Sequence, residues 1–236
     1  MGETAVTVRT STREGVRTVE LADPDRRNAV SPADLTRLES AIRHAEHAGD
    51  PVVYLTGAGA AFCAGADLDA VASLSDPTAF ARHGATVARR IEESDPVVVA
   101  GIDGAARGGG VELALACDLR IATPAATFAE SGVRLGLFGA WGGTVRLPRI
   151  VGEGNALDLS LSGRTIDAEQ AHRIGLVSRI TDDPFDVAVD LAERPADALR
   201  GIKRRIRDRS DVDTQERAEA ELFSRLYDRH GETIDR

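Results

Sequence analysis

Two short segments rich in glycine and alanine constrain the fold of this chain most strongly. The first is Ala61-Phe62-Cys63-Ala64-Gly65-Ala66-Asp67-Leu68, and the second is Ala106-Arg107-Gly108-Gly109-Gly110-Val111-Glu112-Leu113. Each follows strand-forming residues and precedes a helical pattern, so each marks a junction from strand to helix. The N–H groups that begin a helix have no partner within it, and small residues leave them accessible. Two facing junctions of this kind predict a site that binds one developing negative oxygen.

The rest of the chain alternates between strand and helix patterns. Strands are expected at 6–9, 17–21, 51–56, 97–102, 119–122 and 127–129, and helices at 32–48, from about 67, at 77–93 and at 111–117. Strands that are repeatedly separated by helices predict parallel pairing and an α/β fold. This pattern alone leaves an ordinary doubly wound sheet open. After about residue 178 the chain becomes helical and charged, with a boundary expected at Asp182-Asp183-Pro184.

Composition excludes several classes of function. The net charge of −9 gives little electrostatic support for nucleic-acid binding. No stretch approaches the ~20 apolar residues of a membrane span, and the chain starts without a secretory signal pattern, so we expect a cytoplasmic protein with no membrane partner. Cys63 and Cys117 lie among small apolar residues and are expected to be reduced packing residues, although Cys63 as a nucleophile is the alternative. The five histidines show no ligand spacing, so no metal is expected.

Nearly the whole chain resembles the crotonase (enoyl-CoA hydratase/isomerase) superfamily. The matching blocks are 25–31, 54–59, 61–68, 108–118, 128–136, 142–144, 150–152, 161–164 and 168–177. The resemblance implies an α/β fold in which ββα turns form a spiral with two roughly perpendicular sheets over residues 1–180. It implies a C-terminal helical oligomerisation segment at 181–236, shorter than in relatives, and a homotrimer or hexamer. It also implies an acyl-CoA substrate, with coenzyme A as part of that substrate and no separate cofactor.

The resemblance assigns catalytic roles to three residues. The backbone amides of Ala66 and Gly109 match the two donors that grip the thioester oxygen in the family. Glu112 matches the glutamate that orients or deprotonates the water added to the β-carbon in hydratases. Its apolar neighbours predict a raised pKa. The alternative for Glu112 is a helix-start carboxylate that complements the helix dipole.

The chain departs from the hydratase pattern at one position. The second catalytic glutamate of that pattern falls on Gly132, which cannot transfer a proton. Glu130 could substitute, but we interpret it as structural. Trp141 is expected either to shape the acyl pocket or to seal a loop as a core aromatic residue. By resemblance, the coenzyme A arm lies along the Asn28 turn and along Ala64, Gly65, Asp67 and Leu68.

The sequence therefore predicts a thioester enzyme of the hydratase type. The leading reaction is water addition to a 2-enoyl-CoA, within fatty acid metabolism and slowed by the missing carboxylate. Replacement of Gly132 by glutamate is expected to raise the rate if the pocket has kept its hydratase shape. Isomerisation, thioester hydrolysis, decarboxylation and non-catalytic acyl-CoA binding by an auxiliary subunit stay open as alternatives.

Overall fold

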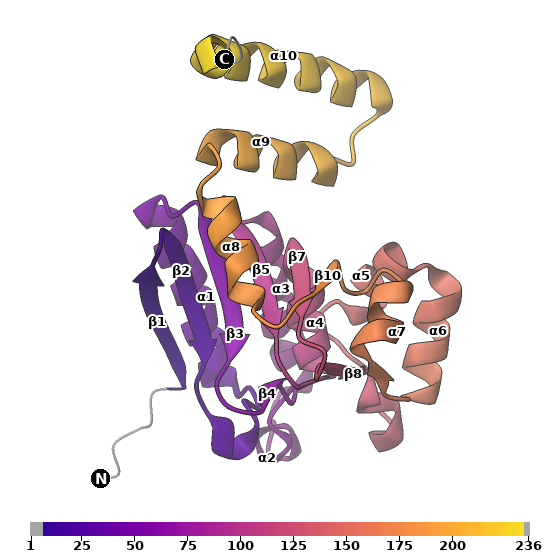
Figure 1. Cartoon of the computed structure of the whole chain (residues 1–236). Coiled ribbons are helices and arrows are strands. Elements are labelled where there is room, and N and C mark those ends of the chain that lie inside the picture. The colour runs from indigo at the N-terminus through magenta and orange to yellow at the C-terminus, as the bar shows by residue number, and fades with distance from the viewer. Residues whose placement is uncertain (1–6, 234–236) are drawn as a thin grey trace.

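A computed structural model describes residues 7–233, which form a mixed α/β structure with two sheets (Figure 1). The larger sheet has the order β1 (Val8–Arg13), β2 (Val16–Leu21), β3 (Val52–Gly57), β5 (Val97–Ile102), β7 (Leu119–Ala122) and β10 (Arg179–Ile180). The smaller sheet has the order β4 (Ala61–Cys63), β6 (Ala105–Arg107), β8 (Thr127–Ala129) and β9 (Ile166–Asp167). The chain passes repeatedly from one sheet to the other, so the spiral prediction is confirmed and the doubly wound alternative is wrong.

Parallel pairing dominates both sheets, as the alternation of strands and helices predicts. Only β1 with β2 and β8 with β9 pair antiparallel within the described residues. The β2–β3, β3–β5, β5–β7 and β7–β10 pairs of the larger sheet are parallel, as are β4–β6 and β6–β8 of the smaller one. Parallel neighbours end at the same edge of a sheet, and this places consecutive strand-to-helix junctions together.

Three helices cover the sheets and have clear sequence signals. In α1 (Pro32–Ala48), Ser31 and Asp34 form a capping box and Gly49 ends the helix with a φ of 74°. In α3 (Pro77–Glu93), Asp76 caps the first turn. The bounds of α1 and α3 agree with those expected from sequence. Every residue of α4 (Gly109–Ala116) is buried, and this helix begins two residues earlier than expected because Gly109 and Gly110 join its first turn.

The remaining helices surround this core. They are η1 (Pro24–Arg26), α2 (Leu68–Ala72), η2 (Ser131–Leu135), α5 (Gly143–Val151), α6 (Glu153–Ser162), α7 (Ala168–Arg173), α8 (Pro184–Ala192), α9 (Ala196–Arg207), α10 (Val212–His230) and η3 (Gly231–Thr233). None of the described helices is both long and apolar enough to cross a membrane.

Residues after 180 also contribute to the packed core. The first helix after that point, α8, packs on the larger sheet, with Phe185 edge-on to Tyr54 at 5.2 Å between ring centroids. The α9–α10 hairpin then lies beyond one end of the sheet, and α2 lies at the opposite end (Figure 1). Asp118 anchors α9 through ion pairs of 2.9 Å to both Lys203 and Arg207. Residues 1–6, including residue 6 of the first expected strand, and residues 234–236 lie outside the described part.

Candidate active site

The two glycine- and alanine-rich junctions lie side by side. Strands β4 and β6 are parallel neighbours, so the chain leaves both at the same edge of the smaller sheet. Gly65 has a φ of 94°, and a Cβ on it would lie 2.6 Å from the carbonyl oxygen of Arg107 and 3.2 Å from the amide nitrogen of Gly109. Only glycine combines this conformation with so close an approach. The tertiary structure thus brings the two predicted donor segments into contact.

A cavity of about 300 Å³ opens beside these junctions. Eight residues predicted from sequence line it: Ala64, Gly65, Ala66, Leu68, Gly109, Glu112, Gly132 and Trp141. An apolar wall is formed mostly by Val71, Leu74, Phe80 of α3, Leu135 and residues 137–140. An apolar cavity with few polar groups is the usual form of a small-molecule site.

The backbone amides of Ala66 and Gly109 have no acceptor among the described residues. The neighbouring amides of Gly65, Asp67 and Gly108 do have one: the Cys63 thiol, the Val30 carbonyl and the Ala129 carbonyl, respectively. Gly109 begins α4, so its amide also lies at the positive end of that helix. Two unengaged amides therefore belong to residues that line one cavity.

Glu112 is almost fully buried and lines the same cavity. Its Oε1 accepts 2.7 Å hydrogen bonds from the backbone amides of Trp141 and Gly143. Burial raises the pKa of Glu112, whereas these two amides and the charge of Arg146 act in the opposite direction. The carboxylate is thus fixed through one oxygen and desolvated, which suits a general base. A carboxylate that only complemented the helix dipole would not need these contacts.

Sequence reasoning missed the residues that hold this carboxylate in place. Gly143 supplies one amide, and a Cβ on Gly139 would lie 2.7 Å from the Glu112 carboxyl carbon. Arg146 donates to the Trp141 carbonyl at 3.1 Å and pairs with Glu92 of α3 at 2.6 Å. Arg146 therefore ties the 139–143 loop to the core. The sequence signal was present in the Gly142-Gly143-Thr144 block, but the loop could not be placed against Glu112 without the fold.

Trp141 combines both roles that the sequence left open. Its side chain is buried, packs edge-on against Phe80 at 5.7 Å between ring centroids, and lies on the Cα atoms of Gly84 and Gly109. A Cβ on Gly84 would meet the indole at 2.1 Å, and one on Gly109 would meet it at 2.4 Å. The indole therefore fills space that two glycines leave between α3 and α4, and it forms one wall of the cavity.

Asn28 and Asp67 are not among the residues that line the cavity. The Asn28 side chain is buried and donates to the carbonyls of Ala58 at 2.9 Å and Ala61 at 2.7 Å. Asp67 caps α2 through the amides of Asp69 and Ala70 and pairs with Arg26. Both side chains hold the backbone before and after β4. The predicted contact of these two residues with coenzyme A would therefore be made by their backbone atoms, and it stays a prediction.

Backbone atoms lie close to Gly132, which also lines the cavity. A Cβ on Gly132 would lie 3.1 Å from both the carbonyl oxygen of Leu137 and the Cα of Phe138. The backbone that follows η2 therefore lies in tight contact with the position of the missing second glutamate. A side chain there would need this backbone to shift by about a few tenths of an ångström.

The thiols of Cys63 and Cys117 and the carboxyl group of Glu130 are also buried. Burial raises the pKa of the Cys63 and Cys117 thiols to about 12, which confirms that both are packing residues. Glu130 is also buried, but its Oε1 has no hydrogen-bond partner. Among residues 7–233, no group of three or more histidine, cysteine, aspartate or glutamate side chains has the arrangement of a metal site.

Comparison with known proteins finds similar sequences and similar structures. The family model described as enoyl-CoA hydratase/isomerase matches residues 11–233. A probable enoyl-CoA hydratase of Mycobacterium tuberculosis is 42% identical over 194 residues, which cover 79% of this chain and 74% of the relative. A short-chain-enoyl-CoA hydratase of Clostridium acetobutylicum is 33% identical over 228 residues, covering 91% and 87%. The crystal structure of an enoyl-CoA hydratase from Thermoplasma volcanium superposes with a TM-score of 0.90 at 32% identity, covering 94% and 93%.

Proposed function

This chain belongs to the enoyl-CoA hydratase/isomerase family and has a hydratase-type function, and on that premise we propose that it adds water to the double bond of a 2-enoyl-CoA at the Glu112 cavity. One observation carries the proposal. A desolvated, fixed carboxylate and two residues with unengaged amides line a single apolar cavity. The acyl-CoA is the substrate, and the chemistry needs no separate cofactor.

In the proposed mechanism, the amides of Ala66 and Gly109 bind the thioester oxygen. Water adds to the β-carbon while Glu112 accepts one of its protons, and the electrons of the double bond move onto the thioester oxygen as an enolate. A single backbone donor of this kind contributes about 3–4 kcal/mol to transition-state stabilisation in other enzymes. Glu112 then returns the proton to the α-carbon, so a hydroxyl and a hydrogen have been added and the carboxylate is restored.

One carboxylate performs both proton transfers in this scheme. Gly132 offers no acid, and the Leu137–Phe138 backbone lies in tight contact with it. General acid or base catalysis typically contributes 10²–10⁴-fold, so we expect turnover below that of a two-glutamate hydratase by about this factor. The bulk of Trp141 and Phe80 at the cavity wall favours a short acyl chain.

Assembly into a homotrimer, alone or paired as a hexamer, is part of the proposal. Ile206, Phe223 and Tyr227 of the α9–α10 hairpin are 72%, 71% and 57% exposed, and α10 has no buried residue. Apolar side chains this exposed are expected to be covered by a neighbouring subunit. The predicted cytoplasmic location and the role in fatty acid metabolism stay predictions.

A panel of acyl-CoA thioesters tests the function. We expect hydration of crotonyl-CoA, followed by loss of the enoyl-thioester absorbance, and a fall of about 10²–10⁴-fold in Glu112→Gln. The glutamine Oε1 can still accept from Trp141 and Gly143, so acyl-CoA binding should survive. Glu169→Gln, which changes an exposed residue of α7, is the matched control and should retain full activity. Unchanged turnover in Glu112→Gln would reject Glu112 as the base, and binding without turnover of any thioester would favour an auxiliary acyl-CoA binder.

A further inference from the structure

A second cavity, of about 390 Å³, lies where α9 meets the C-terminal ends of α3 and α5; we call it the basic cavity. Five of its nine lining residues are basic, although the chain as a whole has a net charge of −9. They are Arg149 of α5, Lys203, Arg204 and Arg207 of α9, and Arg209 in the segment between α9 and α10. A cavity of this volume is large enough for a small molecule.

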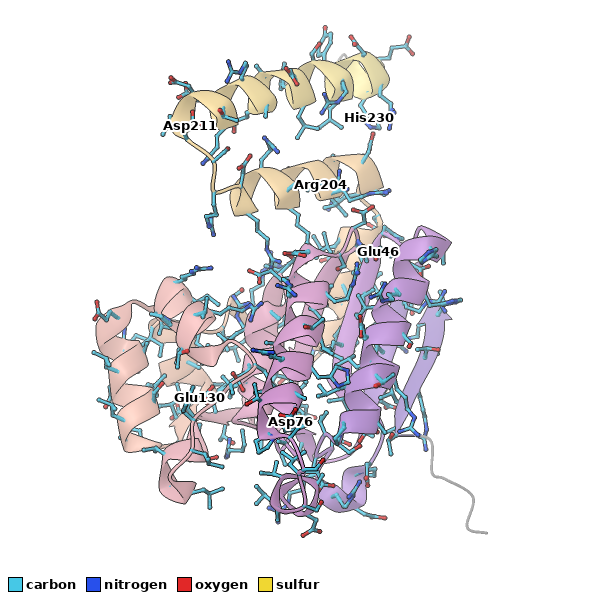
Figure 2. The ribbon with its side chains drawn as sticks, turned by 180° about the vertical axis from the view of Figure 1, so that it is seen from behind. Glu46, Asp76, Glu130, Arg204, Asp211 and His230 are labelled. Carbon is cyan, nitrogen blue, oxygen red and sulfur yellow. The ribbon has the colours of Figure 1, made fainter. Side chains whose placement is uncertain are left out.

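The basic cavity is remote from the Glu112 cavity. Phe80, in the first turn of α3, lines the Glu112 cavity, whereas Glu92 and Glu93, at the end of the same helix, line the basic cavity. The 17 residues of α3 span about 25 Å. Figure 2 shows the same separation, with Arg204 of α9 and Asp76, which precedes α3, toward opposite ends of the molecule. A ligand in the basic cavity is therefore held by residues that take no part in the proposed chemistry.

Two of the three acidic residues in the basic cavity are neutralised by arginines outside its lining. Glu92 accepts hydrogen bonds of 2.9 and 2.6 Å from Nε and Nη2 of Arg146. Asp208 pairs with Arg205 at 3.1 Å. Glu93 is exposed and has no partner among the described residues. Glu93 is therefore the one lining carboxylate left to oppose the binding of an anion.

Three of the five basic residues hold α9 in place. Lys203 and Arg207 share the carboxylate of Asp118, each at 2.9 Å. Arg204 pairs with Asp95 at 2.5 Å. Because one carboxylate serves two cations, these three basic residues keep a surplus of positive charge beside the cavity.

Arg149 and Arg209 are the two basic residues that no carboxylate engages within the part of the chain that the structure describes. Arg149 is exposed and has no partner there at all. Arg209 donates from Nη1 to the carbonyls of Ile206 and Asp208, each at 3.2 Å. Planar guanidinium groups bind phosphate through paired N–H donors, and these two groups reach the cavity from different elements.

We propose that the basic cavity binds a hydrophilic small molecule that carries phosphate, through the guanidinium groups of Arg149 and Arg209. Every lining residue except Ser94 is charged, so the cavity suits a sugar phosphate or a pyrophosphate rather than an acyl chain or a nucleobase. The bound phosphate joins α5 to the segment that follows α9. This inference goes beyond the proposed function and does not depend on it.

The first experiment is calorimetric titration of the full-length protein with pyrophosphate at low ionic strength. We expect saturable binding that weakens as salt is added. Arg149→Gln and Arg209→Gln should each weaken it by about 10-fold, because each removes a charged hydrogen-bond donor. Glu93→Gln should strengthen it by about 2–5-fold, because it removes the free opposing charge. Arg173→Gln, which removes an exposed and unpartnered arginine of α7, is the matched control and should bind like the wild type.

Thermal unfolding is the second readout. Pyrophosphate at ten times its Kd should raise the Tm of the wild type by about 3–6 °C and leave that of the Arg149→Gln/Arg209→Gln double variant unchanged. The Tm of each variant without ligand shows whether it is folded. Citrate, which has a similar charge but no phosphate, should bind at least 10-fold more weakly than pyrophosphate.

Four results would overturn the inference. They are the absence of saturable binding, an equal effect of Arg173→Gln and Arg149→Gln, equal binding of citrate and pyrophosphate, and displacement of pyrophosphate by butyryl-CoA. The last result would assign the phosphate site to the coenzyme A of the substrate. If the protein hydrates no enoyl-CoA, the proposed function fails, whereas the pyrophosphate titration still decides this inference.

Discussion

The backbone amide of Trp141 donates a 2.7 Å hydrogen bond to Oε1 of Glu112, while the indole of Trp141 lies against Gly109. One residue thus fixes the proposed base through its backbone and forms the cavity wall beside a proposed oxyanion donor through its side chain. Because the amide belongs to the backbone, the side chain can be changed while the contact with Glu112 is kept. Base positioning and pocket shape can therefore be tested separately at this position.

Trp141→Ala is expected to enlarge the cavity and shift preference toward longer acyl chains. The indole fills the space between Gly84 and Gly109. Its removal should raise kcat/KM for a long-chain enoyl-CoA relative to crotonyl-CoA by about 10-fold. The reason is that an added methylene is worth about 1–3 kcal/mol in an apolar pocket. The lost packing should lower the free energy of unfolding by about 3–5 kcal/mol. Trp141→Phe is the control and should change both the chain-length preference and the free energy of unfolding by less. An unchanged chain-length profile in Trp141→Ala would exclude the indole from the acyl site.

Gly65→Ala is expected to separate the two donor segments. At a φ of 94°, a Cβ only 2.6 Å from the Arg107 carbonyl oxygen must push β4 away from β6. Misplacing one oxyanion donor should lower kcat by about 10²–10³-fold. Gly154→Ala is the matched control, because its added methyl meets no atom within 4 Å on α6. Steady-state rates measure the loss of kcat, and thermal unfolding shows whether the variant is folded. Full activity in a folded Gly65→Ala protein would contradict the oxyanion assignment.

Gly132→Glu is expected not to raise the rate, contrary to the expectation from sequence. The new Cβ would lie 3.1 Å from the Leu137–Phe138 backbone, which lines the cavity and would have to move. We expect turnover of crotonyl-CoA at or below the wild-type value. Gly132→Ala separates the effect of the Cβ from that of the carboxylate. A gain of 10-fold or more in Gly132→Glu alone would show that the loop yields and that the hydratase pocket can be restored.

Glu130 is expected to make stability depend on pH. Its folded-state pKa of about 8 exceeds the ordinary value of 4.5, so the folded protein binds the proton more tightly than the unfolded chain. This contribution to stability is fully present below about pH 4.5 and falls as the pH rises toward 8, by at most about 1.4 kcal/mol per pH unit. Denaturant unfolding at pH 5.5 and 7.5 should therefore show Glu130→Gln gaining stability relative to wild type at the higher pH. Parallel curves for the two proteins would mean that Glu130 is ionised in the folded state.

Trimer formation is expected to depend on the exposed apolar residues of the α9–α10 hairpin. Light scattering at micromolar concentration should give the mass of a trimer or hexamer. Ile206→Glu should reduce it, because it places a charge on a 72% exposed apolar residue. Glu219→Gln on α10 is a control that should leave the mass unchanged. A monomer across the micromolar range in the wild type would refute the assembly.

Local signals were sufficient for much of the fold. The bounds of α1 and α3 follow from Ser31, Asp76, the prolines after them and the apolar spacing of Leu35, Leu38 and Ile42. The two strand-to-helix junctions were also recognised from sequence, and the family resemblance added the roles of Ala66, Gly109 and Glu112. These features depend on neighbours along the chain, and their physical causes act over a single helical turn or strand.

Only the tertiary structure decided what surrounds those residues. The contact of Glu112 with the amides of Trp141 and Gly143 joins positions about thirty residues apart, and no local pattern specifies it. The backbone over Gly132, the unpartnered carboxyl of Glu130 and the packing of α8 on the sheet are likewise long-range outcomes. Burial and pairing across the fold set the pKa and partners of each acid, whereas the sequence by itself determined which acids, amides and glycines were available to be buried.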